Sequence, residues 1–523
     1  MRTKNLFFFK LNQMIKKINF PIIILANFLS ASYLHAQSPF VISDVEYEME
    51  HPVIKDLNSC ILLKDALFVV EQEYTKSSKY KLILDIYDPI TFTRKNTGVL
   101  VNEVETQDKE HPVPLKTFAA NNKLYTFYID YDRKSTIIKL VVADITGKVI
   151  TQPTTIAEVS DKKGMYTGSI NYDVVFSPDL TKFAVGLSIK YLMYPQDSYI
   201  TIYNSNSLEK IKTVNPTQKI EDLYLFSGTF SINDNGDVIC AQHISKFDTD
   251  IKYQIVAYEL IGSKDSKSKV FTITDKLNIR SALFLADQNK FITAGLCNDI
   301  ETKGGPEPKL ANYFFETDGS GKVKNLSFNY FNDDFYKRMG YKLGTWAIEK
   351  GTADKSYIVK ELIKNNNDYY FMFTQGFSGT NSSGPYQLER ELMTCKYSSE
   401  GKFQWCAIIP KSTLNKVKNF HYTFNGDKLY FIYAEHPSNF EKIGIYDDKL
   451  KEIEDIKNYK DAVFAQTTID VKTGAVERKL YPSVDGVFIT PINRSISIND
   501  GKSIVVRFVR KNKFSYGRML LMK

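Results

Sequence analysis

The residue types that carry out catalysis or bind metals occur in this chain without the spacing that either chemistry requires. Beyond residue 36 the histidines stand at positions 51, 111, 243, 421 and 436, and no two form the HxH or HExxH pattern of a zinc site. The Gly-rich run 376–384, GFSGTNSSG, lacks the Gly-Lys-Ser/Thr end of a P-loop and the Gly-x-Ser-x-Gly of a hydrolase. We interpret it as a flexible turn and predict no catalytic residue, no metal site and no cofactor, although a site assembled from distant segments stays open.

Aromatic residues beside Asn, Ser and Asp are better candidates for ligand contacts. Such rings stack on sugars or anchor a protein partner when they lie in exposed loops. Phe, Trp and Tyr make up 13% of the chain, so packing within the loops is the competing interpretation for each of them. His243, at the expected end of a strand, is either a ligand-binding residue or a hydrogen-bonded residue of the rim. The candidate binding residues are Tyr191, Tyr194, His243, Trp346, Phe377, Tyr386 and His436.

Two of the five cysteines are placed symmetrically about a turn. Cys395 and Cys406 flank Glu400-Gly401, and a two-residue hairpin turn there would bring them directly opposite each other on adjacent strands. Opposite positions in a hairpin are within reach of a cross-strand disulfide. Two half-buried thiols are the alternative. The other cysteines lie inside apolar runs and are expected to be core thiols: Cys60, Cys240 and Cys297.

The first 36 residues have the organisation of a signal peptide. Five basic residues precede the apolar run 20–29. Leu34-His35-Ala36 then offers a cleavage site before Gln37. Translation from Met14 instead of Met1 would still leave a complete signal. The apolar run is shorter than the roughly 20 residues that cross a bilayer, and no later run competes with it. We therefore expect an exported mature chain without a transmembrane segment.

The charge balance gives no support to nucleic-acid binding. The whole chain has 68 Lys and Arg against 60 Asp and Glu, a net charge of +8. Five of the basic residues belong to residues 1–36, so the net charge of the mature chain falls to +3. No later segment is a dense Lys/Arg block, which is the usual sign of a nucleic-acid-binding surface.

A pair of strands joined by a polar turn recurs along the chain, most clearly at 229–262. Asn, Asp and Gly fill these turns because they adopt the positive φ angles of tight hairpins. Most intervals between successive copies are 53 to 60 residues, and two are 78 and 74 residues long. The second strand of each pair is predicted to begin near Ala66, Leu124, Phe183, Val238, Phe291, Tyr369, Leu429 and Ser503.

A second class of turn lies further along the units. In each, a strand ends in polar residues that are followed by Gly and a new strand, as in the segments 141–150, 314–323, 394–403 and 467–476. Each unit therefore holds four strands in a meander, and four-stranded units at a fixed period in an all-β chain indicate a β-propeller. We predict a single propeller domain over residues 37–523 with eight blades, or seven if the first unit is divided differently. A strand at 40–48 would pair with the last strand and close the ring.

The two long intervals predict insertions near 330–350 and 436–461. Within them, apolar residues recur with helical spacing at 331–340 and 449–460. We expect a short helix in each, either packed on the rim or docking a partner.

Connection lengths differ between the two ends of the predicted strands. Links from first to second and from third to fourth strand are short turns, whereas many links from second to third strand and between units are long. In a meander these two classes leave from opposite faces of the ring, which we name the plain face and the loop-rich face. Since loops on a rigid scaffold commonly carry function, we expect binding at the loop-rich face.

The export signal ending at Ala36-Gln37, the sequence NGDKLYFIY at 425–433 and the ending YGRMLLMK at 516–523 make the chain similar to secreted β-propeller proteins of Gram-negative bacteria. The resemblance is architectural, covers residues 40–523 and carries over no catalytic residue. It implies a periplasmic or outer-membrane-associated location, with the cell surface as the alternative.

The resulting expectation is a non-catalytic binding scaffold that docks a protein partner through its loop-rich face, in a periplasmic or outer-membrane complex of the cell envelope. A glycan-binding or glycan-cleaving propeller is the alternative, because aromatic loops suit sugars and glycoside cleavage uses two carboxylates about 5 to 10 Å apart. A structural envelope protein without a ligand is a third reading.

Overall fold

Alternating apolar and polar residues, interrupted by Asn/Asp/Gly turns, give this chain antiparallel strands, and the computed structural model groups them into eight sheets. Each sheet is one blade of a β-propeller, so the eight-bladed prediction is confirmed and the seven-bladed alternative is wrong. The structure describes residues 40–48, 60–76, 79–105, 113–132, 135–160, 170–189, 197–216, 224–247, 252–262, 268–274, 277–299, 310–332, 357–381, 384–409, 411, 413–414, 420–438, 463–481, 488–490, 496–498, 501–510 and 513–522.

Seven blades are meanders of strands that follow one another in the chain. Blades 1 to 3 consist of β3 (Cys60–Leu63), β4 (Ala66–Lys76), β5 (Lys79–Tyr87) and β6 (Arg94–Glu105); β7 (Val113–Ala120), β8 (Lys123–Asp132), β9 (Ser135–Asp144) and β10 (Val149–Ser160); and β11 (Ile170–Phe176), β12 (Lys182–Ile189), β13 (Asp197–Asn204) and β14 (Lys210–Val214). Blades 4 and 5 consist of β15 (Tyr224–Ile232), β16 (Val238–Phe247), β17 (Lys252–Ile261) and β18 (Ser268–Phe271); and β19 (Leu277–Asp287), β20 (Lys290–Asp299), β21 (Leu310–Asp318) and β22 (Val323–Tyr330).

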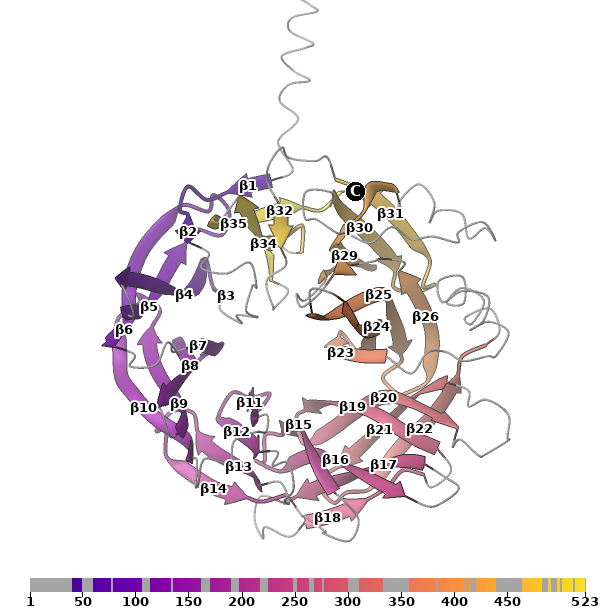
Figure 1. Ribbon diagram of the computed structural model, residues 1–523. Coiled ribbons are helices and arrows are strands. Elements are labelled where there is room, and N and C mark those ends of the chain that lie inside the picture. The colour runs from indigo at the N-terminus through magenta and orange to yellow at the C-terminus, as the bar shows by residue number, and fades with distance from the viewer. Residues whose placement is uncertain are drawn as a thin grey trace, which may run out of the picture.

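Blades 6 and 7 continue the same order. They consist of β23 (Tyr357–Asn365), β24 (Asp368–Asn381), β25 (Gly384–Tyr397) and β26 (Phe403–Ile409), with the short β27 (Thr413–Leu414) also paired to β25; and β28 (His421–Asn425), β29 (Lys428–Glu435), β30 (Val463–Asp470) and β31 (Val476–Leu480). In Figure 1 the first strands of the blades lie nearest the ring axis and the fourth strands form the outer rim. The eight predicted starts of second strands fall within one residue of the observed ones.

Blade 8 joins the two ends of the described chain. It contains β32 (Phe488–Thr490), β33 (Ser497–Ile498), β34 (Ser503–Arg510) and β35 (Lys513–Leu520), and its outer edge is formed by the N-terminal β1 (Phe40–Ile42) and β2 (Tyr47–Glu48). Phe40 pairs with Met519, and Tyr47 pairs with Phe514 (Figure 1). The predicted closure of the ring by the N-terminal strand is thus confirmed, and it covers an edge of β35 that would otherwise be exposed.

The core lies between neighbouring blades rather than at the centre of the ring. Between blades 5 and 6, for example, Phe314 stacks on Tyr397 with ring centroids 4.7 Å apart, beside the buried Phe371 and Met393. Each sheet buries both faces in this way, which explains why the second and third strands are almost continuously apolar. Stability is therefore distributed over a closed series of blade-to-blade interfaces.

The turns on the plain face combine a positive-φ glycine with a side-chain acceptor. Gly147, Gly321, Gly401 and Gly474, in the four turns of the second class, have φ between 72° and 88°. In the turn of blade 5, the Asp318 carboxylate accepts hydrogen bonds from the backbone N–H groups of Ser320 and Lys322. Equivalent acceptors begin the turns of five other blades: Asp88, Asp144, Asn204, Ser398 and Asp470.

These turns also connect adjacent blades. Side chains on the outer strand of one blade donate to backbone carbonyls in the turn between the third and fourth strands of the next blade. The hydrogen bonds are Asn96 Nδ2 to Thr146 O (2.9 Å), Lys269 Nζ to Ser320 O (3.3 Å) and Trp405 Nε1 to Val471 O (3.1 Å). Several short turns of the plain face are therefore joined to the neighbouring blade by side-chain hydrogen bonds.

Two expectations about connections need comment. The run 376–384 is not a flexible turn, because β24 and β25 continue through it as paired strands up to Asn381 and Gly384. The helices expected at 331–340 and 449–460 lie, apart from residues 331 and 332, outside the described residues. Among the described residues, no helix has both the length and the apolar character that crossing a membrane would need.

Candidate functional site

The two faces of the ring differ in the length of their connections. On the plain face, first and second strands are joined by turns as short as Asn121-Asn122 and Asn366-Asn367. On the loop-rich face, the strand bounds leave residues 190–196, 300–309 and 436–462 between second and third strands, and residues 331–356 between blades 5 and 6. The predicted asymmetry is therefore present in the strand bounds, although most residues of these long connections lie outside the described part of the chain.

Blade 6 carries a paired extension on the loop-rich face, which we name the arm (residues 376–389). At this end of the blade, the last described pair between β23 and β24 is Tyr357 with Gln375. The pairing between β24 and β25 continues further, from Gly376 opposite Glu389 to Asn381 opposite Gly384. Six further residues of β24 extend past β23, about 20 Å of extended chain at the usual rise per residue. β27 pairs with Leu388 and Glu389 at the base of the arm.

The structure brings two of the predicted binding residues together and leaves three of them outside the described residues. Phe377 and Tyr386 both belong to the arm, where Phe377 pairs with Leu388 and Gly379 pairs with Tyr386. This register makes positions 377 and 386 diagonal neighbours on the two-stranded ribbon. The predicted residues outside the described part of the chain are Tyr191, Tyr194 and Trp346.

The two histidine candidates occupy different environments. His243 was expected at the end of a strand, and this expectation is wrong. It lies within β16, which continues to Phe247, and it pairs with Val256 of β17. His436 directly follows β29, and its Nδ1 lies 2.7 Å from Ser438 Oγ. That nitrogen is therefore engaged in a local turn.

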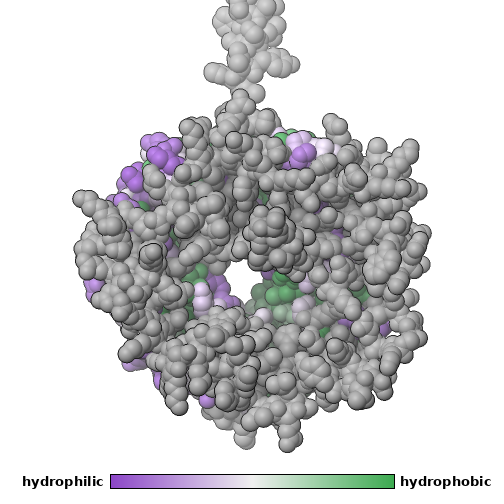
Figure 2. Space-filling model, in the orientation of Figure 1, coloured by the Kyte–Doolittle hydropathy of each residue, from purple (hydrophilic) through white to green (hydrophobic). Residues whose placement is uncertain are grey.

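A narrow opening runs along the ring axis in Figure 2, with apolar and polar residues beside it. First strands supply ion pairs and hydrogen bonds there between adjacent blades. Lys116 Nζ of β7 lies 3.0 Å from Asp173 Oδ1 of β11, and the Tyr422 hydroxyl of β28 donates to the Glu361 carboxylate of β23. These contacts join first strands of neighbouring blades and so stabilise the ring.

The interface between blades 8 and 1 contains a buried charged network that the sequence-based analysis missed. Arg507 of β34 is 3% exposed, and its guanidinium lies 4.7 Å from the ring centroid of Phe514 and donates to the Tyr516 hydroxyl (3.3 Å). Tyr516 donates in turn to the carboxylate of Glu71 in β4, which is 4% exposed. Burial raises the pKa of Glu71, and Arg507 and Tyr516 act against that rise.

A second part of this network holds the N-terminal strand. The Tyr47 hydroxyl of β2 lies 2.5 Å from Asp85 Oδ2 and 2.5 Å from the Tyr87 hydroxyl, both on β5 of blade 1. Asp85 is fully buried and also accepts from the Thr97 hydroxyl (2.5 Å). In both parts the sequence signal was a charged residue inside an apolar strand: Glu71 in ALFVVEQEY, Asp85 in KLILDIY and Arg507 in SIVVRFVR.

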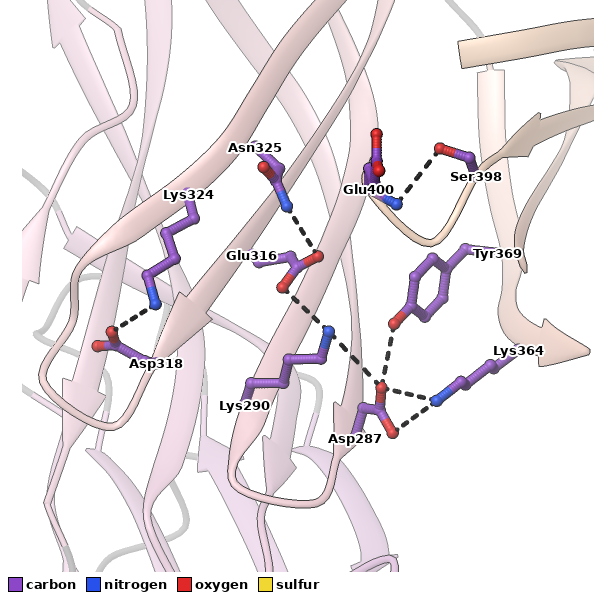
Figure 3. Close-up of polar contacts among 10 residues, drawn as sticks. All are labelled: Asp287, Lys290, Glu316, Asp318, Lys324, Asn325, Lys364, Tyr369, Ser398 and Glu400. Carbon is purple, nitrogen blue, oxygen red and sulfur yellow. Dashed lines mark hydrogen bonds and ion pairs between the residues drawn. The ribbon is translucent and has the colours of Figure 1, made fainter. Parts of the chain in front are cut away.

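A surface network on the plain face joins blades 5 and 6 (Figure 3). Asp287, in the first turn of blade 5, pairs with Lys364 of blade 6 (2.9 Å) and accepts from the Tyr369 hydroxyl (3.0 Å). Lys290 bridges Asp287 (3.8 Å) and Glu316 (3.0 Å). Partial burial acts to raise the pKa of Asp287, but the bonds from Lys364 and Tyr369 lower it overall. Every carboxylate in this network is neutralised, as expected of a structural contact.

Cys395 and Cys406 lie directly opposite each other on β25 and β26, as predicted. The expected two-residue turn is wrong, because residues 398–402 separate the two strands and a register shift lies between Lys396 and Tyr397. Both are free thiols in the structure, so the disulfide itself stays a prediction. The three other cysteines are buried, which confirms their interpretation as core thiols. Among the described residues, no three His, Cys, Asp or Glu side chains are grouped so that they could hold a metal ion.

Comparisons with known proteins agree with the fold and add no family. No protein-family model matches the chain, and no curated protein sequence matches it. Among solved structures, it is similar to the β-propeller domain of the trilobed protease from Pyrococcus furiosus (10% identity, TM-score 0.36, 82% of this chain and 98% of that one). It is also similar to a europium-containing methanol dehydrogenase (10%, 0.42, 90% and 85%) and a polysaccharide lyase (10%, 0.37, 83% and 94%). The chain thus resembles diverse β-propellers at low identity, and these likenesses carry no argument about its activity.

Proposed function

We propose that this protein is an exported, non-catalytic scaffold that docks a protein partner through its loop-rich face, within a complex of the cell envelope. The observation that carries the proposal is the asymmetry between the faces. Polar groups of the plain face are directed to neighbouring blades through short turns, as the Asp287–Lys364 contact exemplifies. The opposite ends of the strands carry the arm and the long connections, which is where a rigid scaffold presents a binding surface.

The arm is the part of this face that the described backbone defines best. Its strand from Gly376 to Asn381, GFSGTN, contains no charged residue and no proline. Within the described residues, its pairing with β23 extends only as far as Gln375. Sheet edges that must stay solvent-exposed usually carry Lys, Pro or a bulge to prevent pairing with another chain. Apart from the register shift between Thr374 and Gly376 at its base, this edge carries none of these devices. Such an edge favours a protein partner that adds an extended segment to β24, with Phe377 and Tyr386 as its side-chain anchors.

The test is a comparison of matched variants in envelopes solubilised under mild conditions. In the first variant Asn-Gly replaces residues 377–388, because Gly376 lies opposite Glu389 and a two-residue turn can close the shortened hairpin. The control exchanges the exposed plain-face pair by combining Glu400→Lys with Lys402→Glu. We expect the wild type and the control to capture the same partner and the armless variant to lose it. Recovery of the wild type only as a free monomer, or equal capture by the armless variant, would contradict the proposal.

The proposed location has its own test. Cell fractionation should recover the chain in the periplasm or with the outer membrane, and N-terminal sequencing should find Gln37 as its first residue. An unprocessed chain in the cytoplasm would contradict export. Binding of purified protein to a glycan array through Phe377 and Tyr386, without a protein partner, would favour the glycan alternative instead.

A further inference from the structure

The thiols of Cys395 and Cys406 occupy one level of the third and fourth strands of blade 6. They are direct partners in the register, between the pairs Thr394–Ala407 and Lys396–Trp405. Directly opposite residues of an antiparallel pair have Cα atoms about 4.5 to 5.5 Å apart, which is within the range that a disulfide spans. Both side chains belong to or pack against the core between blades 5 and 6.

The environments of the two thiols are unequal. Cys395 is fully buried, and its Sγ accepts a hydrogen bond from Asn312 Nδ2 of blade 5 (3.3 Å). The Tyr397 hydroxyl fixes Asn312 from the other side by donating to its Oδ1 (2.5 Å). Cys406 is only partly buried. A reagent in solution therefore meets Cys406 first, while Cys395 is held in place behind it.

We propose that Cys395 and Cys406 form a thiol–disulfide exchange site, in which Cys406 attacks an external disulfide and Cys395 resolves the product. In the first step the Cys406 thiolate attacks one sulfur of a disulfide such as oxidised glutathione, forms a mixed disulfide and releases one thiolate. In the second step Cys395 attacks the Cys406 sulfur, forms the Cys395–Cys406 bond and releases the second thiol. The two electrons and two thiol protons end on the two glutathione molecules.

The resulting bond lies on a path that joins three blades. β25 contacts blade 5 through Cys395 and Asn312, and β26 contacts blade 7 because Trp405 Nε1 donates to Val471 O (3.1 Å). Oxidation would add a covalent link between these two strands. Burial, and then the neighbouring Cys406 thiol, raise the pKa of Cys395 well above its ordinary value, while Asn312 acts in the opposite direction. Because Cys395 is fully buried and Cys406 is only partly buried, an external disulfide reaches Cys395 only after it has been attached to Cys406.

The experiment uses the folded chain, reduced and then exposed to oxidised glutathione, with its thiols trapped by alkylation after denaturation. The number of alkylated cysteines should fall from five to three. Trypsin cuts after Arg390, Lys396, Lys402 and Lys411, so the product should appear as peptides 391–396 and 403–411 linked by a disulfide. Persistence of five thiols, or a stable glutathione adduct on the wild type, would overturn the proposal.

Variants decide the order of attack. Cys395→Ala should accumulate a glutathione adduct on Cys406, whereas Cys406→Ala should take up none, and the Cys240→Ala control should oxidise like the wild type. An adduct on Cys395 in the Cys406→Ala variant would refute the assigned roles. Should Cys395→Ala fail to fold, limiting iodoacetamide on the reduced wild type answers the same question. Labelling of Cys406 before Cys395 supports the proposal, and the reverse order overturns it.

Discussion

The buried network between blades 8 and 1 should respond non-additively to mutation. Glu71→Gln removes the carboxylate that faces Arg507 through Tyr516, and Arg507→Met removes the guanidinium from the same network. Glu71 and Arg507 are 4% and 3% exposed, so either single change leaves a buried charged group without its counter-charge. We expect each single variant to lose about 3–5 kcal/mol of unfolding free energy. The double variant should lose no more than either single one, because its remaining groups need no counter-charge.

Chemical denaturation, monitored by circular dichroism and fluorescence, measures these differences in unfolding free energy. The variants can be compared if the dependence of that free energy on denaturant concentration, the m-value, is unchanged. The expected coupling energy has the size of one single loss, about 3–5 kcal/mol, which is at or above the upper end for residues in one network. The control is the exposed pair Glu400 and Lys402, whose removal should produce no measurable change. Additive losses within about 0.5 kcal/mol, or single losses below about 1 kcal/mol, would refute the reasoning that this network stabilises the interface where the ring closes.

Three further perturbations test the fold around this interface and elsewhere. A mature chain that lacks residues 37–48 should expose the edge of β35 and form dimers or larger species by size-exclusion chromatography with light scattering; a stable monomer would show that closure is dispensable. Gly295→Ala should destabilise the chain, because the added Cβ would lie 1.9 Å from Ser281 O. Gly426→Ala is the control: its Cβ meets nothing within 4 Å, so it should be destabilised less, and only by the positive φ of that residue. Slight burial acts to raise the pKa of Asp318, but hydrogen bonds from Ser320 and Lys322 lower it to about 2, from an ordinary 3.8. The stability that these bonds provide is present above pH 3.8 and is lost as the pH falls toward 2; Asp318→Asn should weaken that dependence in denaturant titrations at a series of pH values, and an unchanged profile would contradict it.

The sequence was sufficient where the determining interactions are local. The starts of the second strands followed from Asn/Asp/Gly turns, and the same turns show positive φ at Asn121, Gly236 and Gly426. The opposite placement of Cys395 and Cys406 followed from their spacing about one turn. Residues 40–48 were predicted to close the ring because the last blade lacked a fourth strand. Each of these conclusions depends on residues within a few positions of one another, or on a simple count of strands.

The sequence was misleading where two local signals conflicted. Gly, Ser and Asn in 376–384 favoured a turn, yet pairing with Pro385–Glu389 extends the strands through most of it, since an antiparallel partner can hold residues of low β-propensity in a strand. His243 was placed at a strand end because the following residues are polar, but β16 continues to Phe247 opposite Lys252. In both cases the partner strand decided the boundary.

By itself, then, the sequence determined the strand order, the closing strand and the difference between the two faces, because turn chemistry and strand period are encoded over short distances. It left seven blades as an alternative to eight, and the sheet topology decided for eight. Only the tertiary structure decided which side chains meet across the blades. Tyr516 and Glu71 are 445 positions apart, and Asn312 and Cys395 are 83 positions apart. Such contacts arise from the curvature and closure of the ring, which no local pattern specifies. The buried charges of the closing interface and the unequal environments of Cys395 and Cys406 are therefore visible only in the assembled ring.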